Sequence, residues 1–318
     1  MKFLLFFAAL LHSAHATLLY STDFENFTVG DNQWAGTDGW VITDNANGIS
    51  FIDNTGFGGA LGNHAALGLK QPGSTNRVSV LKQITHNHTS NGESIITIDA
   101  LVSIRDSSNG RYDRFYLSFF NADIKRMATI RFDNREIPFG IWREQANIDG
   151  SSLLQFDTLT DFIHEELDEL FISIDLANNT WSASLSGLPL FENAPFTNAA
   201  NPADINLGAV GFEWQISATG PAGHGDNFLL VADFAVNSFN PEDPIPPTLN
   251  LIYNGGSSAT ISWPAKAGAS YQIEYSDDLE TWFDDLPNST FNNISSSGPL
   301  TFTDEAAPAT RYYRVVLN

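Results

Sequence analysis

The chain contains no cysteine, so disulfides, thiolate catalysis, zinc–thiolate sites and iron–sulfur clusters are excluded. Basic residues are scarce: 15 lysines and arginines stand against 37 aspartates and glutamates, giving a net charge of -22. Because contacts with phosphate groups need Lys and Arg, this balance argues against binding to nucleic acid or to an anionic membrane. After residue 16, no apolar run approaches the ~20 residues that a membrane helix needs. The surface is therefore expected to be acidic and solvated, without a membrane span.

Residues 1–16 have the pattern of an export signal. Lys2 gives a positive start, Phe3 to Leu11 is an apolar run too short to span a bilayer, and Ala14-His15-Ala16 places small residues at a cleavage site. The alternative is a buried N-terminal strand. We predict a secreted or cell-surface protein. Secreted animal domains of this size usually carry disulfides, so the lack of cysteine favours a bacterial source.

Alternation of apolar and polar residues with a period of two dominates the rest of the chain. One buried face per strand is typical of antiparallel sheets, so the fold class is predicted to be all-β. A polar turn at 177–180 predicts a hairpin, because Asn tolerates left-handed backbone conformations. Apolar residues from Leu159 to Leu167 recur at helical spacing, which predicts a short helix. The predicted strands lie near 96–104, 115–119, 128–132, 172–176, 181–185, 210–216 and 228–236.

A break in the pattern follows Phe239. Residues 240–247 contain four prolines, a composition typical of an extended linker between domains. About 300 residues after the signal exceed the usual size of a single core, which also favours two domains. The predicted organisation is a signal peptide at 1–16, a large domain at 17–239, the linker at 240–247 and a small domain at 248–318.

From Leu19 to about Phe239 the chain resembles the concanavalin A-like (laminin G-like) jelly-roll superfamily. The resemblance rests on Asp23–Phe27 with Gly39-Trp40, on the hairpin Asn179–Gly187, on Leu207–Phe212 and on Val231–Val236. It implies a large jelly-roll β-sandwich. That fold hosts lectins, adhesion modules, glycosidases and lyases, so it names an architecture and leaves the function open.

From about Pro246 to Asn318 the chain resembles a fibronectin type III-like module. Ile261–Pro264 matches the second strand with its core Trp, Tyr271–Ser276 the third strand, and Arg311–Val315 the sixth. The resemblance implies a small β-sandwich. Since no segment for a seventh strand follows, the domain either has six strands or leaves an edge open for another partner.

The jelly-roll resemblance also implies one structural calcium ion between the first and last strands. Glu25 and Asp233 are the matching carboxylates, with Asp31 as a further candidate. Calcium takes six to eight hard oxygens, and backbone carbonyls supply most of them once two carboxylates provide charge. The alternative is that Asp233 simply faces water.

Two further clusters are weaker candidates. Glu165, Glu166, Asp168 and Glu169 offer carboxylates, but their spacing does not match that of jelly-roll glycosidases, and a solvated acidic segment is the favoured interpretation. His86 and His88 would share one face of a strand and could hold a metal ion, although a solvated loop is favoured. No residue is assigned a catalytic role.

Tryptophans divide into two groups. Trp181, Trp214 and Trp263 follow the core alternation, whereas Trp34, Trp40 and Trp142 fall in predicted loops or loop edges. Exposed Trp rings can stack on sugar rings while polar neighbours such as Arg143 bind the hydroxyl groups. Core packing is the alternative for each of them. The predicted ligand-binding residues are Trp34, Trp40, Trp142 and Arg143.

The sequence therefore predicts a secreted or cell-surface binding protein without catalytic activity, with polysaccharide or extracellular matrix as its partner and one structural calcium as its cofactor. A polysaccharide-degrading glycoside hydrolase or lyase on the same fold is the first alternative. A structural surface component is the second. The sequence gives no oligomeric state.

Overall fold

The computed structural model describes residues 16–43, 49–70, 77–134, 140–146, 153–216, 223–240, 249–253, 258–265, 267–277, 281–296, 298–307 and 311–317. The chain forms two compact units, one spanning Thr17–Pro241 and the other including Glu242–Asn318. The predicted export signal, up to residue 15, and the predicted linker after Asn240 lie outside the described residues. Among the residues described, no helix is long and apolar enough to cross a membrane.

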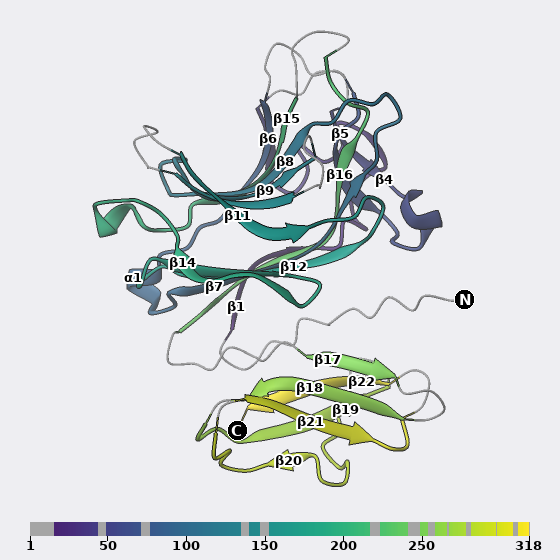
Figure 1. The fold of residues 1–318 in the computed structure, drawn as a ribbon, viewed down its shortest axis with the longest axis vertical. Helices are drawn as coiled ribbons and strands as arrows, with labels where there is room; N and C mark the ends of the chain where they lie inside the picture. The colour runs from purple at the N-terminus through teal and green to yellow at the C-terminus, as the bar shows by residue number, and fades with distance from the viewer. Residues whose placement is uncertain are drawn as a thin grey trace. The chain divides into compact units, whose positions relative to one another are not determined.

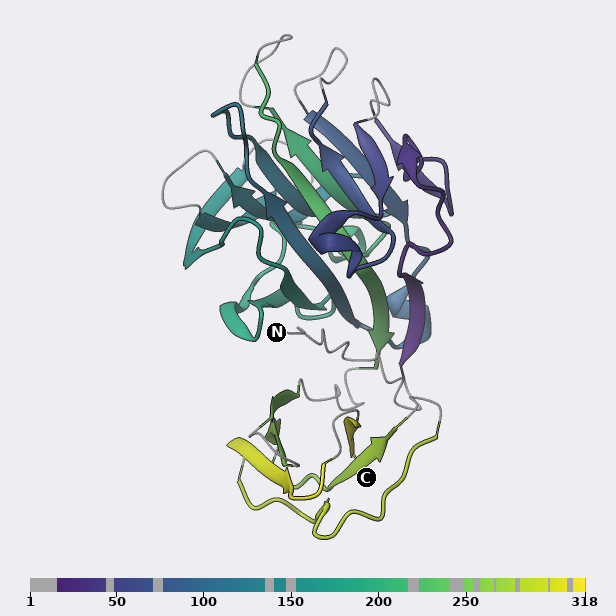
Figure 2. The same ribbon diagram turned by 90° about the vertical axis from the view of Figure 1, so that its right-hand side faces the viewer.

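The larger unit is a sandwich of two antiparallel sheets, which Figure 1 shows as two facing layers. One sheet contains β1 (Thr17–Thr22), β2 (Gly30–Asp31), β4 (Ser50–Asp53), β5 (His64–Gly68), β7 (Ile95–Arg105), β12 (Asp168–Asp175), β13 (Thr180–Leu185), β14 (Leu188–Pro195) and β16 (Phe228–Phe239). Its strand order is β14-β13-β12-β7-β16-β5-β4-β2, and β1 also pairs with β16. Figure 2 shows the long strands β7 (blue) and β16 (green) running side by side.

The second sheet of this unit has seven strands. They are β3 (Trp40–Ile42), β6 (Arg77–Gln83), β8 (Arg114–Phe120), β9 (Arg126–Asp133), β10 (Gly140–Ala146), β11 (Leu153–Asp161) and β15 (Ala209–Gln215). The strand order is β11-β10-β9-β8-β15-β6-β3. Helical structure is limited to α1 (His88–Asn91) and two 3-10 turns, Gly56–Gly59 and Pro202–Asp204, within the described part of the chain.

The core lies between the two sheets and is built by the alternation seen in the sequence. Along β7, every second residue from Ile96 to Ile104 is buried in it. β12 and β13 are joined by the predicted hairpin, with Asn179 in the left-handed conformation at φ 53°. The all-β prediction is confirmed, because a strand that alternates in this way can bury only one face.

The predicted helix at 158–167 is wrong. β11 continues to Asp161, and residues 162–167 form an irregular turn before β12. Phe162 is buried, but Leu159 is 89% exposed and Ile163 60% exposed. A helix here would have no apolar face to bury, because of these three residues only Phe162 packs inside the protein.

The smaller unit contains two three-stranded sheets. Its strands are β17 (Asn250–Tyr253), β18 (Ala259–Ala265), β19 (Tyr271–Ser276), β20 (Thr290–Phe291), β21 (Gly298–Asp304) and β22 (Tyr312–Leu317). The strand orders are β17-β18-β21 and β20-β19-β22, all antiparallel. A separate core includes Ile261, Trp263, Tyr271 and Ile273. The residues described here provide six strands.

Candidate functional site

The face of the seven-stranded sheet that points away from the core carries three rows of mostly polar side chains. The strand register places Ser79, Glu213, Tyr116, Arg131, Trp142 and Asp157 side by side across six strands. One row beside it contains Arg77, Gln215, Arg114 and Asp133, and the other contains Leu81, Gly211, Ser118, Thr129, Glu144 and Gln155. Because alternate residues of a strand share a face, these rows lie opposite the apolar residues that build the core.

We call this surface the arginine face, because four arginines gather on it: Arg77 from β6, Arg114 from β8, and Arg126 and Arg131 from β9. These are four of only 15 basic residues in the chain. An acidic protein has thus placed a large share of its positive charge on one face of one sheet.

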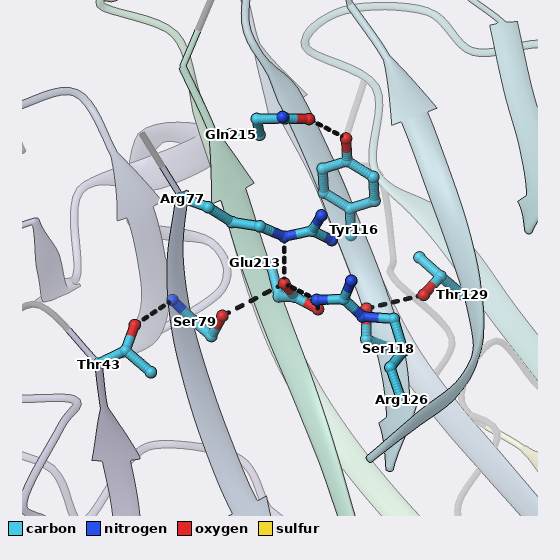
Figure 3. Close-up of polar contacts among 9 residues, drawn as sticks. All are labelled: Thr43, Arg77, Ser79, Tyr116, Ser118, Arg126, Thr129, Glu213 and Gln215. Atoms are coloured by element: carbon cyan, nitrogen blue, oxygen red, sulfur yellow. Dashed lines mark hydrogen bonds and ion pairs between the residues drawn. The ribbon is translucent and has the colours of Figure 1, made fainter. Parts of the chain in front are cut away.

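Glu213 lies at the centre of the arginine face and is fully buried (Figure 3). Its Oε2 accepts hydrogen bonds from Arg77 Nε at 2.5 Å, from Arg126 Nη2 at 2.6 Å and from Ser79 Oγ at 3.2 Å. Its Oε1 accepts a further bond from Arg126 Nη2 at 2.8 Å. Burial favours the neutral carboxyl, but the charges of Arg77 and Arg126 together outweigh it and hold the pKa of Glu213 below its ordinary value.

Tyr116 lies beside Glu213 and supports the same arrangement. Its ring lies under the guanidinium of Arg77, with 4.2 Å from Cζ to the ring centroid. Its hydroxyl donates a hydrogen bond to Gln215 Oε1. Burial raises the pKa of Tyr116, so the phenol is neutral and acts as a donor. Arg77 is thereby held both by a charged partner and by an aromatic ring.

A second buried ion pair lies toward β10. Arg131 Nη1 donates to Glu144 Oε1 at 2.7 Å, and both side chains are at least 96% buried. The guanidinium of Arg131 lies 4.8 Å from the ring of Trp142, which is half-buried. Gln155 Nε2 also donates to Glu144 Oε1, at 3.0 Å. Burial, opposed mainly by Arg131, raises the pKa of Glu144.

Arg114 is fixed in the same way by the third buried carboxylate of the arginine face. Its Nε and Nη2 lie 2.8 Å and 2.7 Å from Asp133 Oδ2. Asp133 is fully buried, and Arg131 Nη2 reaches the same oxygen at 3.4 Å. All four guanidinium groups are therefore held in set orientations by Glu213, Glu144 and Asp133. Such a surface is pre-organised for hydrogen bonding to a ligand.

Of the predicted ligand-binding residues, Trp142 lies on the arginine face but Arg143 does not. Arg143 follows Trp142 in β10 and so points to the opposite side of the sheet. Its guanidinium lies 4.0 Å from the ring of Phe156 and donates to the carbonyl oxygen of Pro195 at 3.3 Å. Trp142 and Arg143, both predicted to bind ligand, therefore lie on opposite faces of the sheet.

The other two predicted ligand-binding residues, Trp34 and Trp40, are core residues. They are 0% and 1% exposed, and their ring centroids are 5.2 Å apart. Trp40 Nε1 donates to Tyr20 Oη at 2.9 Å, and Tyr20 in turn donates to Asp38 at 2.6 Å. Both rings belong to the core cluster, so neither has a face open to a sugar.

The two predicted calcium ligands lie close to each other. Asp233 sits in a bulge of β16 at φ 42°, and the partner strand β1 ends just before Asp23 and Glu25. Burial, followed by the charges of Asp23 and Glu25, raises the pKa of Asp233 to about 6. Asn63 donates from its side chain to the backbone carbonyls of Glu25 and Phe27. Glu25 and Asp233 could supply two charged oxygens to a hard cation, whereas the carbonyl oxygens of Glu25 and Phe27 already accept hydrogen bonds from Asn63.

The remaining sequence candidates are not assembled into a site. Where the chain is described, no group of three or more His, Asp or Glu side chains could hold a metal ion. His86 and His88 do not share a strand face, because His88 begins α1 and His86 Nε2 lies 2.8 Å from the carbonyl oxygen of Glu93. Glu165 pairs with Arg105, and Asp168 accepts from Ser186 at 2.8 Å.

Glu169 lies instead beside Asp99, on the outer face of the nine-stranded sheet. The register pairs Glu169 with Leu101 and Phe171 with Asp99, so the two carboxylates are diagonal neighbours. Burial, and then the charge of Glu169, raises the pKa of Asp99 to about 7.

Asp99→Asn is therefore expected to stabilise the protein at pH values well above 7 and to have no effect in acid. Because the pKa of Asp99 is higher in the folded than in the unfolded state, ionisation of Asp99 favours unfolding. The wild type therefore loses stability relative to Asp99→Asn as the pH rises through about 7. The full shift corresponds to about 4 kcal/mol, and partial exposure reduces the expected gain to about 2 kcal/mol. Thermal melts across pH measure it, with exposed Asp123→Asn as the control. A pH-independent gain would contradict the assignment.

Glu213, Arg77, Arg126 and Arg131 were not among the residues predicted from the sequence. Arg77, Arg131 and Glu213 occupy the polar positions of alternating strands, which on their own are indistinguishable from a solvated outer face. Arg126 has the parity of the core residues of β9 and reaches the outer face beyond a shift in the register of β8 and β9. The available signal was the recurrence of arginine at such positions in an acidic chain. Their association depends on the pairing of strands that are distant in sequence, and the sequence does not specify that order.

No protein-family model matches the chain, and no curated protein matches it. Solved structures to which it is similar include a sialidase (8% identity, TM-score 0.43, 67% of this chain and 18% of that one). Another is an endo-1,3-beta-glucanase from Streptomyces sioyaensis, with 9% identity and a TM-score of 0.48 over 74% of this chain and 100% of that one. A third is the carbohydrate-binding module CBM66 from Bacillus subtilis, with 12% identity and a TM-score of 0.37 over 64% of this chain and 97% of that one. The chain spans less than a fifth of the sialidase. These scores are too low to carry a function across.

The structure is that of an all-β protein, with a large antiparallel sandwich whose seven-stranded sheet presents the arginine face. The second unit is a small all-β module with a core of its own.

Proposed function

We propose that this chain is a secreted binding protein without catalytic activity, and that the arginine face binds polysaccharide. The observation that supports this most strongly is that half-buried Trp142 lies on the same face as three partly exposed arginines, Arg77, Arg114 and Arg126. An aromatic ring offers an apolar surface to a sugar ring, and polar side chains held by hydrogen bonds offer donors to its hydroxyl groups. The export signal predicted at residues 1–16 would place this surface outside the cell.

Trp142→Ala is expected to weaken polysaccharide binding about ten- to a hundredfold, because an aromatic anchor at the centre of an interface contributes about 1.5–3 kcal/mol. Affinity electrophoresis of the full chain in gels containing a panel of polysaccharides measures the loss. The matched control is Trp282→Ala, which removes a half-buried Trp that packs under Arg314 in the smaller unit. Unchanged binding by Trp142→Ala, or an equal loss in both variants, would contradict the proposal.

Calcium is proposed as a structural ion at Glu25 and Asp233. The ion would neutralise the carboxylates that raise the pKa of Asp233 and fix the bulge of β16 against β1. Added calcium is expected to raise the melting temperature of the wild type. At a calcium concentration a hundred times the Kd, the free energy of unfolding should increase by about 2.7 kcal/mol. Asp233→Asn is expected to abolish that rise. A wild type that does not respond to calcium, or an Asp233→Asn variant that responds equally, would overturn the assignment.

Hydrolysis is a second candidate, because the pKa values of Glu144 and Glu213 are displaced in opposite directions, as in an acid–base pair. Their strands argue against it. β9 and β8 separate β10 from β15, which places the strands about 14 Å apart at ~4.8 Å per step. Glycosidase carboxyl groups lie about 5–9.5 Å apart. No oligosaccharide is expected from long incubation with polysaccharide. Release that Glu144→Gln abolishes would establish the enzyme instead.

A further inference from the structure

The arginine face differs in charge from the rest of the chain. Four guanidinium groups share it with three buried carboxylates, Asp133, Glu144 and Glu213, among the residues that the structure describes. The fourth acidic residue of its rows, Asp157, is exposed on β11, four strands from Glu213. Although the chain has a net charge of -22, positively charged side chains therefore outnumber negatively charged ones over β6, β15, β8 and β9.

The buried carboxylates orient the four arginines and leave part of three of them accessible. Arg77, Arg114 and Arg126 are 26%, 20% and 27% exposed, whereas the carboxylates that they contact are fully buried. The accessible parts of this ion-pair network therefore belong to arginine side chains, although Arg77 Nη2 and Arg126 Nε are themselves buried. A ligand approaching the face meets donors and positive charge, while the acceptors of Glu213 and Asp133 are already enclosed.

Guanidinium groups held in this way favour an anionic partner. Their remaining nitrogens can donate to the oxygens of a carboxylate or sulfate, and charge-assisted hydrogen bonds are roughly twice as strong as neutral ones. Because Glu213 and Asp133 already fix the side chains, little rotamer entropy is lost on binding. Repulsion from the distant acidic surface is weak, since at physiological salt charges are screened over about 8 Å.

We infer that the arginine face selects polysaccharides bearing carboxylate or sulfate groups over neutral ones, with Arg126 and Arg77 binding the anionic group while Trp142 stacks on a sugar ring. The inference rests on the proposed function and specifies its ligand class. It gives Glu213 a positioning role, because Glu213 orients the two arginines that contact the ligand.

Affinity electrophoresis with the full chain tests this inference on three probes: polygalacturonate for carboxylate, carrageenan for sulfate and galactan for a neutral chain. At least tenfold tighter binding to one of the anionic probes than to galactan is expected, with a loss of that preference as salt concentration rises. Comparing polygalacturonate with carrageenan shows whether carboxylate or sulfate is the group recognised.

Arg126→Gln is expected to weaken binding to the anionic probe about ten times more than it weakens binding to galactan. The matched control, Arg105→Gln, removes an arginine of similar exposure that pairs with Glu165 on the other sheet. Arg126→Lys keeps the charge beside Glu213 but loses the fork, and is expected to retain the fold with an intermediate preference.

The outcomes separate this inference from the proposed function. Equal binding of all three probes by the wild type, or equal losses in Arg126→Gln and Arg105→Gln, would overturn the selectivity and leave polysaccharide binding standing. Failure of the wild type to bind any of the three probes, or any neutral polysaccharide in the wider panel, would remove both.

Discussion

Glu213→Gln is expected to destabilise the large unit by about 3–5 kcal/mol, the range for breaking a buried ion pair by removing one partner. The substitution preserves the shape of the side chain but leaves the guanidinium groups of Arg77 and Arg126 facing each other without a counter-charge. Urea unfolding measures the loss. Glu166→Gln, a change at an exposed glutamate, is the matched control and is expected to stay within about 0.5 kcal/mol of the wild type.

The effect of Glu213→Gln should also depend on pH. The folded-state pKa of Glu213 lies below its ordinary value, so its contribution is fully present above the unfolded pKa and is lost as the pH falls through the folded one. The stability difference between wild type and variant should therefore shrink in acid. A difference that stays constant down to acid unfolding would mean that Glu213 acts through packing and not through its charge.

Trp40→Ala is expected to lower the free energy of unfolding by about 3–5 kcal/mol, because it opens a cavity in the core. Trp40 packs against Trp34, Phe212 and Phe234 and is 1% exposed. Trp40→Phe keeps most of the volume and loses the hydrogen bond to Tyr20, at an expected cost of about 1–2 kcal/mol. Thermal or urea unfolding measures both variants.

The Trp40 variants also separate a core role from a ligand-binding role. Folded Trp40→Phe should bind polysaccharide as the wild type does, because Trp40 does not reach the arginine face. If Trp40→Phe kept its stability and lost binding, the assignment of Trp40 to the core would be wrong.

The strands were predictable because burial of one face imposes a period of two on the sequence. Ile96 to Ile104 on β7 and Val210 to Trp214 on β15 show it, and their apolar positions are buried as expected. The helix predicted from Leu159 to Leu167 failed because apolar spacing alone does not determine whether a core lies beside the segment. Trp34 was misplaced for the converse reason: a loop that folds over a sandwich can bury its aromatic rings.

The arginine face could not be predicted from the sequence, because the residues in contact are far apart along the chain. Arg77 and Glu213 are 136 residues apart, and Arg126 and Glu213 are 87 apart. Arg77 and Glu213 meet because β15 pairs with β6, and Arg126 reaches Glu213 from β9 across β8. Alternation indicates that Arg77 and Glu213 occupy polar positions, but the order of strands decides which polar positions adjoin one another.

Hydroxyl-radical footprinting of the full chain, with and without a bound polysaccharide from the panel, tests most directly where the ligand lies. Binding on the arginine face predicts that oxidation of Trp142 on β10 and Leu81 on β6 decreases, while that of Trp282 and Phe283 in the smaller unit is unchanged. Protection confined to Trp282 and Phe283, with Trp142 and Leu81 oxidised as before, would contradict the assignment of the arginine face as the binding surface.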